Sequence, residues 1–362
     1  MSARAAEAGS RPMTDKDLTL ADFGWTSFFQ SQIDPGETLF PVRVMAVHRD
    51  RLEVAGPGVV ADTPPFADSA GGDESTATIG DWLLIEPDTL RPRRLLDRRS
   101  LFKRRAAGTE RRLQLIAANV DTLFIVSSCN RDFNIARLER YLALAREAEV
   151  TPVVVLTKAD LAEDAEAFAA QARKLLPGLL VETLDARDPG SVALLAPWCG
   201  RGQTVALVGS SGVGKSTLVN TLTGEAIATQ GIRAHDERGK HTTTGRALHR
   251  LPGGGWLVDT PGMRELQLTD AEAGIKDVFA DLVMLARQCR FADCRHQTEP
   301  GCAVQAAIAS GEVDSARLHR WRKLVAEEAY NNETLSERRA RDRAFGKMAR
   351  RAMQDKRARR GG

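Results

Sequence analysis

Apolar and polar positions alternate over short distances in the first part of the chain, between residues 37 and 97. The segments 40–48, 52–54 and 80–85 have the pattern of β-strands. A stretch rich in Gly, Pro and Asp at 55–74 separates them. Several short strands in one small region favour a barrel of the oligonucleotide-binding (OB) type, and an unspecialised β-module is the alternative that composition leaves open.

From about residue 115 the pattern changes to strands that alternate with helices. Residues 120–126 form a continuous apolar run, which is typical of a buried parallel strand. Residues 135–149 have helical spacing, because Leu138, Tyr141 and Leu142 share one face. Further apolar strands are expected at 152–156, 179–181, 205–208 and 256–258. This alternation predicts a doubly wound α/β domain.

After about residue 275 the pattern becomes helical, and residues 314–330 look like an amphipathic helix. We therefore expect a multidomain protein with five parts. They are a loose N-terminal arm (1–36), an OB-like β-barrel (37–97), an α/β P-loop domain (98–275), a helical metal-binding domain (276–335) and a basic tail (336–362). The tail is expected to be flexible, or helical only when bound. Aromatic residues in the arm, Phe23, Trp25, Phe28 and Phe29, could dock on the rest.

Charge is distributed unevenly, although the formal net charge is only +3. Residues 91–112 carry ten Lys and Arg against two acidic residues, and residues 336–360 carry eleven against three. Two basic segments on an otherwise acidic chain suggest contact with RNA, and the alternative is a solvated surface with a flexible tail. The first residues lack the apolar run of a secretory signal, and no stretch of about eighteen apolar residues occurs. We expect a cytoplasmic protein without membrane contact.

The segment Gly209-x-x-x-x-Gly214-Lys215-Ser216 follows an apolar strand and precedes a plausible helix, as a phosphate-binding loop requires. Backbone N–H groups of such a loop and of the helix N-terminus cradle phosphates. Lys215 would neutralise the β- and γ-phosphates and so assist catalysis, and the Ser216 hydroxyl would bind Mg²⁺. The expected loop residues are Gly209, Ser210, Ser211, Gly212, Val213, Gly214, Lys215, Ser216 and Thr217.

Two further short motifs also follow predicted strands. Asp259-Thr-Pro-Gly262 would hold Mg²⁺ through Asp259, by way of water, and sense the γ-phosphate with the Gly262 N–H. Thr157-Lys158-Ala-Asp160 would read the base, because the Asp160 carboxylate can accept two hydrogen bonds from the guanine edge. Adenine lacks that pair of donors, so the motif favours GTP over ATP. A weak match to a supporting base loop lies near Asp185-Ala186.

The order of these motifs is unusual. The base-reading motif at 157–160 precedes the phosphate loop at 209–216, and Asp259 follows both. In an ordinary small GTPase the phosphate loop comes first. The order here indicates a circularly permuted GTPase, in which the segment that senses the γ-phosphate leads directly into the C-terminal helical domain.

Residues between the phosphate loop and Asp259 are candidates for the switch and for catalysis. Within Gly239-Lys-His-Thr-Thr-Thr-Gly245, Thr243 is our choice for the residue that completes Mg²⁺ coordination, and Thr242 is nearly as good. Met263 stands where many GTPases have a Gln that orients water. Either hydrolysis is slow, or another group such as His241 orients the attacking water.

Cys289-x₄-Cys294-x-His296-x₅-Cys302 brings three thiols and an imidazole into a short segment. Four such ligands suit tetrahedral Zn²⁺ in a structural site, because no ligand position stays open. Cys129 and Cys199 lie alone in apolar surroundings, so the chain has no disulfide framework.

Taken together, these motifs resemble the ribosome small-subunit-dependent GTPase family, RsgA/YjeQ, over roughly residues 37–330. The resemblance rests on the permuted order, Ile116-Ala-Ala-Asn-Val-Asp121, Gly239–Thr244, Pro252-Gly-Gly-Gly255 and the Cys/Cys/His/Cys cluster. It implies an OB barrel, a permuted GTPase core and a zinc domain. It also implies binding of the small ribosomal subunit and its rRNA, GTP hydrolysis stimulated by that subunit, and a late checkpoint role in its maturation.

Two other functions compete with this interpretation. The chain could be an RNA-binding assembly protein that senses GTP as a ligand with negligible turnover. A P-loop kinase for a small molecule is disfavoured, because no acceptor site is evident and Asp160 predicts guanine. We expect a monomer that binds GTP and GDP.

Overall fold

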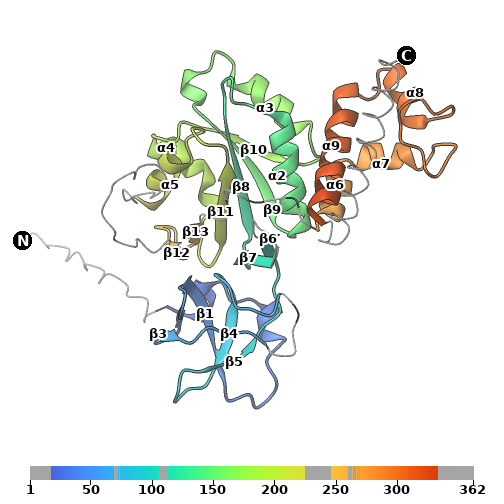
Figure 1. Cartoon of the computed structure of the whole chain (residues 1–362). Helices are drawn as coiled ribbons and strands as arrows, with labels where there is room; N and C mark the ends of the chain where they lie inside the picture. The colour runs from blue at the N-terminus through green and yellow to red at the C-terminus, as the bar shows by residue number, and fades with distance from the viewer. Residues whose placement is uncertain are drawn as a thin grey trace, which may run out of the picture.

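The computed structural model describes residues 18–68, 72, 74–105, 113–224, 246–259, 263, 266, 268 and 270–332. Figure 1 shows three regions in chain order: N-terminal strands, a central α/β domain and C-terminal helices. Among the helices of these residues, none combines the length and apolar character that crossing a membrane requires.

The N-terminal strands form an antiparallel, OB-like module. They are β1 (Phe40–Val47), β2 (Leu52–Gly56), β3 (Val59–Thr63), β4 (Trp82–Ile85) and β5 (Pro92–Leu95). β1 pairs with β2 and with β4, so it joins the β2–β3 pair to the β4–β5 pair. Val42, Val44, Leu52 and Leu83 are fully or almost fully buried between them. β4 is buried along its whole length, and β1 is buried at three successive residues, so burial in this module goes beyond one face of each strand.

Residues 18–36 differ from the expected loose arm, because they pack on the rest of the molecule. A short 3-10 helix, η2 (Leu20–Phe23), and α1 (Ser27–Gln30) bury Phe23 and Phe29. Phe23 stacks on Trp256 with ring centroids 5.6 Å apart. Burial of each such aromatic side chain contributes about 1.5–3 kcal/mol toward holding the segment in place.

A mixed sheet forms the centre of the α/β domain, in the order β10-β9-β8-β11-β13-β12. All neighbouring strands in this order are parallel except β12, which runs antiparallel to β13. Its strands are β8 (Thr122–Ser128), β9 (Thr151–Thr157), β10 (Leu180–Thr183), β11 (Thr204–Gly209), β12 (Arg246–Arg250) and β13 (Trp256–Asp259).

Helices cover both faces of this sheet, as the sequence predicted. Alternate residues of the central strands face α2 (Ile135–Glu147) and α3 (Ala165–Arg173) on one side. The others face α4 (Pro189–Val192), the 3-10 helix η4 (Ala193–Trp198) and α5 (Lys215–Thr223). Because both faces are covered, β8 and β11 are buried along their whole length and are mainly apolar.

The N-terminal module and the α/β domain share one sheet, because β12 pairs with β1 as well as β13. The hairpin of β6 (Leu101–Arg105) and β7 (Leu113–Ala118) connects the two regions along the chain. Arg43 of β1 is buried at this junction and donates to the Phe23 carbonyl at 2.6 Å and the Thr204 hydroxyl at 2.8 Å. Burial lowers the pKa of Arg43 to about 10, so the guanidinium stays charged at neutral pH.

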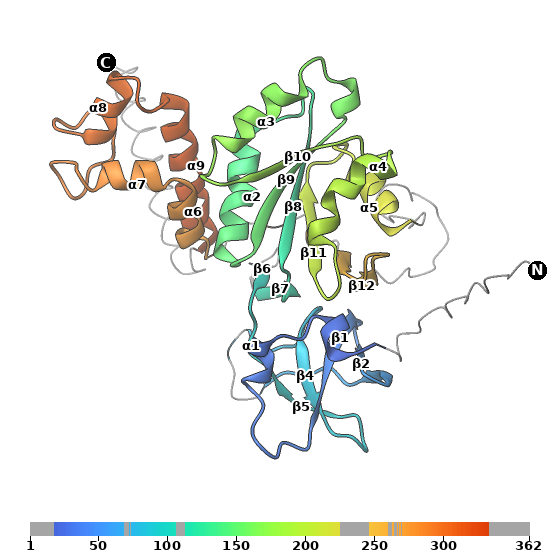
Figure 2. The ribbon, with the colours of Figure 1, turned by 180° about the vertical axis from the view of Figure 1, so that it is seen from behind.

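The C-terminal helices are α6 (Glu272–Val278), α7 (Ala280–Ala286), α8 (Ala303–Ala309) and α9 (Ser315–Asn332). Figures 1 and 2 show α6 and α9 beside α2, on the side of the domain away from α4 and α5. A Cβ at Gly274 would lie 2.0 Å from the Ala143 carbonyl, so only glycine lets α6 approach α2 this closely. The buried Glu139 of α2 pairs with Arg317 and Arg320 of α9.

We predict that Arg43→Met lowers the free energy of unfolding by about 1–3 kcal/mol, because buried acceptors lose their donor. Arg51→Met is the matched control, since Arg51 makes partly exposed ion pairs in the same module. Urea unfolding of both variants measures the difference. Equal midpoints for the two would show that the junction does not depend on Arg43.

Candidate nucleotide site and metal centre

The two motifs that the sequence placed in reversed order meet at one edge of the sheet. β9 ends at Thr157 and β11 ends at Gly209, with β8 between them, and all three strands are parallel. Their carboxyl ends therefore point the same way. The chain order reverses beside β8, since β9 and β10 lie on one side of it and β11 and β13 on the other. Ligands of open α/β sheets bind at such a reversal.

Glycine is required at the start of the phosphate loop. Gly209 has a φ of 146°, and a Cβ there would lie 2.2 Å from the Val126 carbonyl. Gly212 and Gly214 also have positive φ values, 81° and 93°. The loop leads directly into α5, which begins at Lys215. The N–H groups at the N-terminus of such a helix can bind an anion.

Side chains of the base-reading motif hold the phosphate loop. The buried Thr157 hydroxyl lies 2.5 Å from the Val213 carbonyl and 3.1 Å from the Ser127 carbonyl. Lys158 donates from Nζ to the Gly212 carbonyl at 2.9 Å. The sequence placed Thr157 in the base-reading motif, at a position where usual GTPases have Asn. The structure places it as a brace between β8, β9 and the loop.

Lys215 begins α5, and its ammonium group is directed back at the loop. Nζ lies 2.8 Å from the Gly209 carbonyl and also contacts the Ser210 carbonyl. Ser216 and Thr217 follow in the first turn and are exposed, as is Ser211. The Lys215 ammonium therefore lies against the backbone of the predicted phosphate loop.

Asp160 lies one residue beyond the start of the 3-10 helix η3 (Ala159–Leu161) and pairs with Arg187. Nη2 of Arg187 is 2.7 Å from Oδ2 of Asp160. Arg187 also donates to Asp185, and these hydrogen bonds lower the pKa of the Asp185 carboxyl. The Ala186 carbonyl accepts from Thr221 of α5 at 2.7 Å. The segment that matched a base loop only weakly is thus adjacent to Asp160.

Asp259 lies at the same edge, because β13 is the parallel neighbour of β11 and pairs Val258 with Ala206. Its carboxylate is half exposed, and His249 of β12 approaches it to 3.9 Å. The sequence analysis did not single out His249, since only the pairing of β12 with β13 brings the two together. Met263 is buried. Gly262, His241, Thr242 and Thr243 lie outside the described residues.

The first basic segment is largely paired within the fold. Six of its described side chains form ion pairs with acidic residues, namely Arg93 with Glu86, Arg94 with Asp34 and Glu37, Arg98 with Asp81, Arg99 with Asp121, Lys103 with Glu74 and Arg105 with Asp270. The positive charge of residues 91–105 therefore serves the structure in part. The basic tail beyond residue 335 lies outside the described residues.

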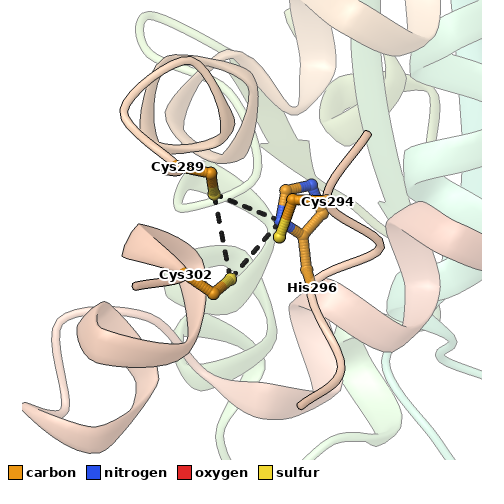
Figure 3. A group of neighbouring side chains, drawn as sticks. All are labelled: Cys289, Cys294, His296 and Cys302. Atoms are coloured by element: carbon orange, nitrogen blue, oxygen red, sulfur yellow. Dashed lines mark hydrogen bonds between the residues drawn. The ribbon is translucent and has the colours of Figure 1, made fainter. Parts of the chain in front are cut away.

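Cys289, Cys294, His296 and Cys302 come together in the C-terminal domain, with all ligand atoms within 4.8 Å of one another (Figure 3). Sγ of Cys289 lies 3.8 Å from Sγ of Cys302, and both lie 3.5 Å from Nδ1 of His296. Tetrahedral bonds of about 2.3 Å to sulfur and about 2.0–2.1 Å to nitrogen give separations of about 3.8 and 3.5 Å. The cluster can therefore hold one metal ion.

Local structure prepares these ligands. Cys302 is the N-cap of α8 and accepts from the Gln305 N–H at 3.4 Å. His296 stacks on Trp321 of α9 with centroids 5.7 Å apart. Burial lowers the pKa of His296, which favours the neutral imidazole that binds metals. The cluster thereby fixes the loop between α7 and α8 against α9.

Comparison with known proteins connects these features to one family. A family model described as RsgA GTPase matches residues 95–269, and a model described as ABC transporter matches residues 198–341, a range that includes the phosphate loop. Two solved structures have a TM-score of 0.58 and 23% identity to this chain: YjeQ from Thermotoga maritima, and YloQ, a circularly permuted GTPase. The chain covers 97% of the first and 100% of the second, which confirms the predicted fold class.

Two relatives are similar over nearly their whole length. The small ribosomal subunit biogenesis GTPase RsgA of Mesorhizobium japonicum is 53% identical, over 90% of this chain and 94% of its own. RsgA 2 of Vibrio parahaemolyticus is 51% identical, over 94% of each chain. The permuted motifs, the fold and this identity agree, and the chain belongs to the RsgA family of GTPases.

Proposed function

We propose that this GTPase is an assembly factor of the small ribosomal subunit, and that it acts in the cytoplasm as a late maturation checkpoint. The names of its relatives support the partner. The observation that carries the proposal is the direct contact of the base motif with the phosphate loop, through Thr157 and Lys158. That contact makes one site from segments in permuted order.

Each residue of the site has a proposed task. Asp160 reads the guanine edge, and the segment from Gly209 to Thr217 holds the phosphates, with Lys215 against the β- and γ-oxygens. Ser216 and Thr243 are the proposed Mg²⁺ ligands, with Asp259 behind a water, and Gly262 senses the γ-phosphate. Mg²⁺, when bound, neutralises charge that develops between the β- and γ-phosphates.

The proposed control of hydrolysis follows from what surrounds the attacking water. Met263 is buried and has no polar atom to offer, so the isolated protein is expected to hydrolyse GTP slowly. His241 is our candidate for the group that orients the water once the small subunit is bound. GTP would hold the RNA-competent arrangement, and hydrolysis would release the factor as a monomer.

For the metal centre we propose one structural Zn²⁺. Three thiols and one imidazole are soft or borderline ligands, and four protein ligands fill a tetrahedral shell. The ion would then stabilise the loop between α7 and α8 rather than take part in chemistry, because no position remains for water.

A second function is favoured by the same buried methionine. If no group replaces the missing Gln, the chain is an RNA-binding protein for which GTP is a sensed ligand with negligible turnover. Turnover with and without small subunits separates the two functions.

We predict that purified small subunits raise the rate of GTP hydrolysis, and that His241→Ala lowers the stimulated rate on the order of a hundredfold. Subunit binding by this variant should stay intact, which co-sedimentation measures. Stimulation of the variant equal to wild type would contradict the role of His241. No turnover by wild type with subunits would favour the sensing protein.

Asp160→Asn should weaken GTP binding on the order of a hundredfold and improve binding of XTP. The reason is that Asn presents a donor where the guanine edge needs an acceptor. Titration calorimetry with both nucleotides checks this. Unchanged affinity for GTP would mean that another group reads the base.

One equivalent of zinc should copurify with the protein under reducing conditions. Cys294→Ala should lose the metal and gain rapid hydrogen exchange beyond about residue 280, because metal binding supplies folding energy in small sites. Cys199→Ala, which alters a buried cysteine outside the cluster, is the control and should retain zinc. Absence of zinc from the wild-type protein would refute the assignment.

A further inference from the structure

Arg187 forms an ion pair with Asp160, the residue whose carboxylate binds the guanine base in the proposed function. Its Nη2 lies 2.7 Å from Oδ2 of Asp160. Arg187 gives Asp160 one N–H donor, from Nη2, while Nε and Nη2 both also contact Asp185. The N1–H and 2-amino group of guanine would donate to the same carboxylate. Arg187 and the base therefore compete for similar hydrogen bonds at Asp160.

The protein holds Arg187 ready for this contact. Its Nε and Nη2 each lie 3.1 Å from an oxygen of Asp185, and its backbone N–H donates to Asp185 at 2.9 Å. Asp185 donates from its own N–H to Ser191 at 3.0 Å. With the Ala186 carbonyl bound to Thr221, the turn that carries Arg187 is fixed to α4 and α5.

The same contacts keep Arg187 in place when it leaves Asp160. Its hydrogen bonds to Asp185 need not break, so Arg187 loses one of its two acidic partners, Asp160, and keeps the other. The Asp160 side chain is 29% exposed and that of Arg187 65% exposed, so water screens their attraction. Displacement by a base is therefore easy, and its effect on affinity is small but measurable.

We propose that Arg187 is an internal competitor for guanine at Asp160, and that it weakens the binding of guanine nucleotides by slowing their association. This inference rests on the proposed base-reading role of Asp160. Apparent affinity falls by the fraction of molecules in which the carboxylate is available. An exposed pair of this kind gives a change of about two- to fivefold.

The first test measures GDP binding and dissociation with a fluorescent GDP analogue. Arg187→Met should bind GDP about two- to fivefold more tightly than wild type, mainly through faster association. Arg173→Met is the matched control, since it removes the same charge from an exposed ion pair with Glu166. The control should bind GDP as wild type does. Equal or weaker binding by Arg187→Met would overturn the proposal, because Arg187 would then support the bound base.

The second test separates this inference from the proposed function. In an Asp160→Asn background, which carries no carboxylate to pair with Arg187, Arg187→Met should leave the affinity for XDP unchanged. An equal gain in both backgrounds would show that Arg187 acts elsewhere. If Asp160→Asn itself keeps full affinity for GDP, the base-reading role fails. If it shifts to XDP while Arg187→Met gives no gain with GDP, only the competition fails.

Discussion

The hydroxyl of Thr157 against the Val213 carbonyl is the contact on which the nucleotide site depends. These residues lie 56 positions apart, and the hydroxyl is buried between the end of β9 and the phosphate loop. Lys158 adds a second bond to the loop at Gly212. Because parallel strands place their carboxyl ends at one edge, the order of the motifs along the chain does not alter their meeting in space. Circular permutation is tolerated for that reason.

Permutation has a mechanical consequence at the other end of the domain. The chain runs from Asp259 at the end of β13 to α6, which begins at Glu272 and packs against α2. α9 then returns to α2, where Arg320 and Arg317 bind the buried carboxylate of Glu139. A buried charge with two partners fixes the position of a helix more than it stabilises it. The metal domain is therefore oriented by the helix that also covers the nucleotide-binding sheet.

The sequence pattern predicted the strands that are buried on both faces and are therefore apolar over a continuous run. Continuous apolar runs predicted β8, β9 and β11, and the fold class followed from them. The sequence pattern did not predict β5 and β6. Their arginines indicate an exposed segment as long as acidic partners such as Glu86 are not known. Phe23 docks on Trp256, more than two hundred positions away, and no local pattern shows such a contact. The ion pair of Arg187 with Asp160 was invisible for the same reason.

Motif spacing gave the candidate site, while geometry supplied the roles of its neighbours. The metal cluster was predictable because its four ligands lie close in sequence, and their spacing in space fits a tetrahedral ion. Thr157 was predicted as part of the base-reading motif, but its contact with the phosphate-loop backbone was not predictable, because Val213 lies 56 positions away. His249 was not, because it reaches Asp259 across two paired strands.

The proposed function requires that the bound nucleotide controls contact with the small subunit. The most direct measurement is the affinity of the full chain for purified small subunits, with GDP and with a non-hydrolysable GTP analogue, at fixed salt. The account predicts tight binding with the analogue and binding at least about tenfold weaker with GDP, a difference of about 1.4 kcal/mol. Equal affinity with both nucleotides would contradict it.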